Sequence, residues 1–182
     1  MGATQIRLTQ DRGEKLDVNF LIPGTPKPDG RPRATPRGVM RNRSADGWKQ
    51  QIRSCVQDSL RDLYGVGSLA SFTRYIDYVE LVFYMPRPKT HLSKDGLIKS
   101  KYLDARHVKR PDLDNLVKAV LDSLQAFDRG PAILWADDCV IHSMDASKKY
   151  SVLLPNEVGP PQLFEGLDLT VTYDLSLGTA LP

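Results

Sequence analysis

Two aspartates one residue apart, Asp112 and Asp114, begin an apolar helical repeat in the stretch KRPDLDNLVKAVLDSL (residues 109–124). One aspartate before a helix is ordinarily explained as a cap, because its carboxylate satisfies free N–H groups and complements the positive helix end. Capping explains the second aspartate poorly. Pro111 disfavours the helical conformation for Arg110, so the chain should arrive extended, and residues two apart in an extended chain point to the same side. If the regular helix begins near Asp114 or the next residue, both carboxylates can project together.

Two carboxylates on one side form a hard-oxygen site suited to Mg²⁺, which keeps several waters and usually takes a substrate phosphate as a further ligand. The stretch WADD offers a third carboxylate from Asp137 or Asp138. Because neighbouring residues on a strand face opposite ways, only one of these two should join the site. Lys118 lies four residues after Asp114 on the predicted helix. It forms either a surface ion pair of little energetic value or an ammonium group beside a metal-bound phosphate.

Other chemistries for these residue types are disfavoured by spacing. The three histidines, at positions 91, 107 and 142, are scattered and lack the spacing of zinc ligands. An EF-hand loop starting at Asp112 would need glycine and glutamate where the chain has Val117 and Ser123. Phosphatases with an aspartyl nucleophile carry D-x-D directly after a buried strand, whereas here the basic stretch RHVKRP precedes it. Mg²⁺ is therefore the metal that we expect.

Positive charge is concentrated in two segments. Residues 27–53 and 86–110 each carry eight cations against two aspartates, a net +6 apiece, in a chain whose total is only +3. Two basic segments on an otherwise acidic body predict a polyanionic partner, although solvated surface loops would show the same pattern.

The elements that must position these residues can be read from apolar periodicity and turn signals. Helices are predicted over residues 47–63 and from about 114 to 124, and the intervening connection from Arg87 to Arg110 is long enough to be functional or mobile. Strands are predicted at Lys15–Pro23, Tyr75–Met85, Ile133–Met144 and Gly166–Leu175. The order β-α-β-α-β-β predicts a single α/β (α+β) domain over residues 15–182, with a mixed four-stranded sheet packed on two main helices, after an N-terminal extension of residues 1–14.

The chain lacks an apolar run of the roughly 18 residues that a membrane helix needs, and its first residues lack the apolar core of a secretory signal. Its two cysteines are far apart and form no CxxC motif. A reduced, cytoplasmic setting is expected.

KRPDLDNLVKAVLDSL followed by WADDCVI resembles the RusA family of Holliday junction resolvases, particularly its phage and prophage members. IPGTPKPDGRPR after the first predicted strand and FYMPRPKTH after the second are also similar to this family, so the resemblance covers most of residues 16–150. Two departures stand out. The family commonly has Gln where this chain has Val140, and the turn between Asp122 and Asp137 is longer here.

The resemblance implies cleavage of four-way DNA junctions with Mg²⁺ and three aspartates per subunit. Carried over by motif, Asp112, Asp114 and Asp138 are the metal ligands, and with Lys118 they form the catalytic set; the longer turn leaves Asp137 as an alternative to Asp138. Lys148 matches a basic position often present in the family.

The expected function is a homodimeric, Mg²⁺-dependent endonuclease that resolves Holliday junctions by paired symmetric nicks, in the cytoplasm of a bacterial host and encoded by a phage or prophage. Two symmetric nicks favour a twofold dimer with paired sites. The first candidates for binding DNA phosphates are Arg31, Arg33, Lys109 and Arg110, together with Lys148. A catalytically silent protein that binds branched DNA, and a flap- or fork-specific metal nuclease, remain the alternatives.

Overall fold

The computed structural model of the protein describes residues 8–9, 15–30, 33–36, 38–40, 43–68, 76–125, 131–155 and 161–174. Its helices are α1 (Asp46–Tyr64) and α2 (Leu113–Leu124), with three short 3₁₀ turns, η1 (Lys89–His91), η2 (Ser100–Tyr102) and η3 (Asp138–Val140). Its strands are β1 (Leu8–Thr9), β2 (Lys15–Pro23), β3 (Arg33–Thr35), β4 (Gly38–Met40), β5 (Ile76–Met85), β6 (Ile141–Tyr150), β7 (Val152–Leu154), β8 (Gln162–Phe164) and β9 (Gly166–Asp174).

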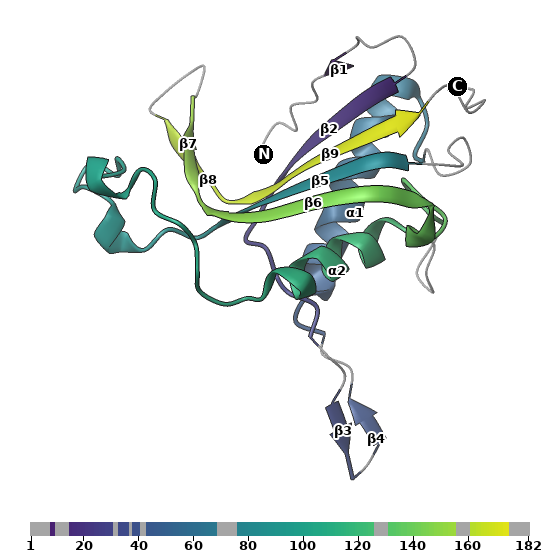
Figure 1. The fold of residues 1–182 in the computed structure, drawn as a ribbon, viewed down its shortest axis with the longest axis horizontal. Coiled ribbons are helices and arrows are strands. Elements are labelled where there is room, and N and C mark those ends of the chain that lie inside the picture. Colours follow the sequence, from purple (N-terminus) through teal and green to yellow (C-terminus); the bar gives the residue numbers. More distant parts are fainter. Residues whose placement is uncertain are drawn as a thin grey trace.

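The main sheet has the strand order β1-β2-β9-β5-β6 (Figure 1). The strand β9 runs antiparallel to both β2 and β5, whereas β6 runs parallel to β5. This confirms the predicted α+β fold with a mixed sheet of four long strands and two main helices. The two-residue strand β1 extends the sheet at its β2 edge. Two separate hairpins, β3-β4 and β7-β8, complete the strand pairing, and Figure 1 shows β3-β4 projecting away from the sheet and helices.

One face of the sheet is apolar and forms the core with both helices (Figure 1). The periods of the sequence explain this arrangement, since alternate strand residues and every third or fourth helix residue are apolar. The fully buried residues of this core include Phe20, Ile22, Ile52, Leu60, Phe83, Leu116, Leu124, Leu169 and Tyr173. Within the described part of the chain, no helix combines the length and apolar character needed to cross a membrane.

The strand predicted at Ile133–Met144 is displaced in the structure. Residues Ile133, Leu134 and Trp135 are fully buried, but they belong to an irregular segment that enters the core after α2. The strand β6 begins only at Ile141 and continues to Tyr150. The predicted strand position was wrong because the apolar residues 133–135 have the composition of a buried strand. The actual strand, β6, lies at the sheet edge and exposes many of its side chains, so its sequence is less apolar.

The long connection between β5 and α2 is held in place by aromatic and polar contacts. The His91 ring stacks on Tyr102 with 4.0 Å between centroids, and His91 and His107 each form a T-shaped contact with the ring of Tyr150. The Arg87 guanidinium donates hydrogen bonds to the carbonyl oxygens of Tyr102 (2.7 Å) and Ser151 (3.0 Å). The segment that leads into α2 is thereby fixed to the end of the sheet.

Candidate active site

Asp112 and Asp114 lie at the N-terminal end of α2. The helix begins at Leu113, and Asp112 precedes it in an extended conformation (φ −70°, ψ 144°) with no capping hydrogen bond from its side chain. Asp114 lies in the first turn, and both side chains are exposed. The two aspartates line one large cleft of about 1040 Å³. Capping therefore does not account for Asp112, and the helix starts one residue earlier than the sequence suggested.

The large cleft is bounded by two segments that are far apart in the sequence. Residues 25–30, which follow β2, contribute to one part of its lining, and Lys109, Arg110, Pro111 and Asp112 contribute to another. Lys109 and Arg110, both predicted to bind DNA, are thus exposed in the same cleft as the paired aspartates. Cations and carboxylates in one open cleft are suited to a phosphate backbone that must be both held and attacked.

A second, smaller pocket of about 570 Å³ lies along the side of α2. Its polar lining consists of Asp114, Lys118, Asp122 and Asp138. Asp114 is the one residue that the linings of the large cleft and the small pocket share. The structure therefore brings Lys118 and Asp138 to the same pocket as Asp114, while Asp112 is reached through the large cleft.

Asp137 and Asp138 have different environments, although both are exposed at η3. The Asp137 carboxylate caps this turn by accepting a hydrogen bond from the Cys139 N–H (3.1 Å), and this bond lowers the pKa of Asp137. The pKa of Asp138 is raised, first by partial burial and then by the hydrogen bond and charge of Asp137 and the charge of Asp122. Both burial and nearby negative charge disfavour the ionised form of a carboxyl group. Asp138 also lines the small pocket, and Asp137 is absent from that lining.

The carboxylates at this end of α2 are chemically suited to a hard divalent cation. Among the residues that the structure describes, no three His, Cys, Asp or Glu side chains are grouped so that they could hold a metal ion. Mg²⁺ does not require such a cage, because it commonly takes one or two carboxylates and fills its remaining positions with water and substrate phosphate. Asp112 and Asp114, which line the large cleft together, have the donor chemistry for this mode of binding, and Asp138 offers a further carboxylate in the small pocket.

The other residues predicted to bind DNA lie in different parts of the chain. Lys148 Nζ donates hydrogen bonds to the carbonyl oxygens of Lys109 (3.0 Å) and Pro111 (2.6 Å), so it supports the backbone that enters α2. Arg33 lies in β3, in the projecting hairpin, and Arg31 lies outside the described residues.

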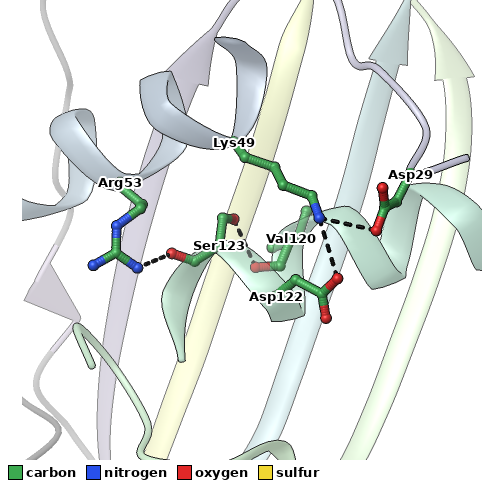
Figure 2. Close-up of polar contacts among 6 residues, drawn as sticks. All are labelled: Asp29, Lys49, Arg53, Val120, Asp122 and Ser123. Carbon is green, nitrogen blue, oxygen red and sulfur yellow. Dashed lines mark hydrogen bonds and ion pairs between the residues drawn. The ribbon is translucent and has the colours of Figure 1, made fainter. Parts of the chain in front are cut away.

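One cluster near the site was not predicted from the sequence. Lys49 of α1 forms ion pairs with Asp29 and Asp122 (Figure 2). Partial burial acts to raise the pKa of Asp29, but the hydrogen bond and charge of Lys49, a hydrogen bond with Asp122 and the charge of Lys118 outweigh it, so the pKa is lowered overall. No local sequence motif predicts this cluster, because its members lie in a loop and on two different helices. The nearest signal was the placement of Asp122 on the polar face of the second predicted helix.

Comparison with known protein families gives one match. A family model described as endodeoxyribonuclease RusA matches residues 23–156, well over half of the chain and the whole of α2 and η3. No curated protein matches the chain. The chain therefore belongs to the RusA family, the endodeoxyribonucleases that act on branched DNA.

Proposed function

We propose that the protein is a homodimeric, Mg²⁺-dependent endonuclease that resolves Holliday junctions by paired symmetric nicks. The observation that carries this proposal is the position of Asp114 between two cavities, with Asp112 in one and with Asp138 and Lys118 in the other. A protein that only binds DNA has no use for carboxylates among its phosphate contacts, because their charge repels the phosphates.

Asp112, Asp114 and Asp138 would hold the metal, which when bound polarises the scissile phosphate and activates the attacking water. The Lys118 ammonium would balance negative charge that develops on the phosphate oxygens during the reaction. Lys109 and Arg110 would hold the strand along the large cleft. Arg31 and Arg33 would also contact DNA phosphates. Lys148 would keep Lys109 in position through the backbone and would add positive charge.

The remaining parts of the proposal concern assembly and setting. Two symmetric nicks on a four-way junction require two sites related by a twofold axis, which a C2 dimer supplies. We place the activity in DNA recombination and repair in the bacterial cytoplasm, with the chain encoded by a phage or prophage, on the strength of the sequence resemblance.

The test is cleavage of labelled DNA by the purified protein. A four-way junction, a linear duplex and a flap are each incubated with Mg²⁺ or with EDTA. Paired nicks in the junction alone, abolished by EDTA, are expected. Cutting confined to the flap would assign a flap nuclease instead, and binding without cutting of any substrate would leave only a silent junction-binding protein.

A further inference from the structure

Lys49 joins three parts of the molecule through one ammonium group. Its Nζ lies 2.9 Å from Asp29 Oδ2 and 3.1 Å from Asp122 Oδ2 (Figure 2). The side chains of Lys49, Asp29 and Asp122 are only 14%, 17% and 22% exposed. Ion pairs that are shielded in this way are screened far less by salt than surface pairs, and loss of the cation leaves two carboxylates facing each other.

Asp29 is connected to α2 a second time through its backbone. The Asp29 N–H donates to the carbonyl oxygen of Asn115 at 2.9 Å, in the first turns of α2. Asp29 and Asn115 both line the large cleft, together with Asp112 and Asp114. The part of the cleft lining formed by residues 25–30 is therefore attached to the helix that carries the proposed metal ligands.

The start of this segment has separate anchors. The Gly24 N–H donates to the carbonyl oxygen of Glu165 (2.9 Å), and the Thr25 hydroxyl donates to the Glu165 carboxylate (3.0 Å). These contacts fix residues 24 and 25 to the end of the sheet without any contribution from Lys49. Lys49 and the Asp29 amide bond act further along, where the segment approaches α2.

We propose that Lys49 is a positioning residue, which clamps residues 25–30 to α2 through Asp29 and Asp122 and so sets the width of the cleft in which DNA is cut. This inference rests on the proposed nuclease function. Lys49 acts through the two aspartates with which its ammonium group is paired. The clamp fixes Lys27, in one part of the cleft lining, relative to Asp112 and Asp114.

Arg53 provides a matched control on the same helix. It lies one turn after Lys49 and also connects α1 to α2 (Figure 2). Among the described residues, its guanidinium donates only to backbone carbonyl oxygens, those of Ser123 (2.6 Å), Gln125 (3.4 Å) and Pro131 (2.8 Å). These acceptors lie at and beyond the C-terminal end of α2, away from Asp29. Loss of Arg53 should loosen helix packing without releasing the cleft segment.

The experiment compares Lys49→Met, Lys49→Arg and Arg53→Met in the full-length protein, using amide hydrogen exchange of Asp29 and single-turnover cleavage of the junction. In Lys49→Met, exchange at Asp29 should accelerate at least about tenfold, because the segment opens locally. Cleavage should slow by about 10- to 100-fold, as expected when reacting groups are displaced by around 1 Å. Junction affinity should stay within about threefold, because phosphate contacts elsewhere supply most of it. Lys49→Arg should restore both readouts, and Arg53→Met should keep both near wild type.

The proposal is overturned if Lys49→Met keeps wild-type exchange at Asp29 and wild-type cleavage, or if Arg53→Met shows the same losses, since the effect would then be general packing. Should Lys49→Met fail to fold, Asp29→Asn replaces it, with the same expected losses and the same contradicting outcome. Failure of the proposed nuclease function is a separate outcome. If the wild-type protein cuts no DNA, the nuclease proposal fails, while amide exchange at Asp29 in Lys49→Met and in the wild-type protein still tests whether Lys49 holds the segment.

Discussion

Asp114 and Asp138 line the same pocket although they belong to different elements, Asp114 to the first turn of α2 and Asp138 to the η3 turn before β6. The buried triplet of Ile133, Leu134 and Trp135 makes this possible, because it secures the chain in the core just before Asp138. The Asp138 carboxylate, which lines the small pocket, is thus positioned by the burial of apolar residues three to five positions earlier in the chain. The site depends on the core as directly as on its own polar residues.

Replacing Asp138 should distinguish it from its neighbour Asp137. We expect Asp138→Asn to reduce the cleavage rate by more than about 100-fold. Loss of a residue that only hydrogen-bonds to a metal ligand typically costs roughly 10- to 100-fold. Asp137→Asn should retain most of the activity, because the Asp137 side chain caps η3 through the Cys139 N–H. Rates with saturating junction and Mg²⁺ provide the measurement, and equal losses in the two variants would contradict the assignment.

Lys118 should affect the chemical step more than binding. Removal of its ammonium in Lys118→Met should lower the single-turnover rate by about 10²- to 10³-fold, the usual effect of losing one donor that stabilises transition-state charge. Junction affinity should change little. Lys118→Arg keeps the charge and should recover part of the rate. A variant whose rate is normal but whose affinity is reduced would make Lys118 a phosphate contact only.

Part of this arrangement follows from sequence alone. The apolar spacing from Leu113 onward predicts α2. Asp112 itself is extended, but the extended approach expected from Pro111 is not found, because the chain bends at residues 109–111. The contact between Lys49 and Asp29 was not predictable. Its partners are brought together only by packing of α1 on α2, and no local spacing rule relates a loop carboxylate to a helix cation.

The phosphate-binding role of the cleft cations should appear in the salt dependence of binding. Each cation that contacts a phosphate contributes about 0.9 to the slope of log affinity against log salt. We expect Lys109→Met and Arg110→Met each to reduce this slope by about 1. Arg61→Met is the control, because Arg61 is exposed on α1 and pairs with Asp58 (3.2 Å) outside the lining of either cavity. An unchanged slope in both cleft variants would show that Lys109 and Arg110 do not contact DNA phosphates.

The histidines of the β5–α2 connection should make folding stability sensitive to mildly acidic pH. The pKa of His91 is lowered by burial and by the charges of Arg87, Lys109 and Lys99. The pKa of His107 is lowered by burial and by the charges of Lys148 and Lys109. Protonation is therefore harder in the folded state than in the unfolded state, where the ordinary value is about 6.5.

The sign of the effect follows from proton uptake. As pH falls below about 6.5, the unfolded state binds protons first, so the free energy of unfolding decreases, and it levels off once the folded state is protonated too. Urea unfolding at pH 7.5, 6.5 and 5.5 measures this decrease. The double variant His91→Phe with His107→Phe retains ring contacts with Tyr102 and Tyr150, and it should lose part of the decrease. An identical decrease in the variant and the wild-type protein would show that other groups govern the acid sensitivity.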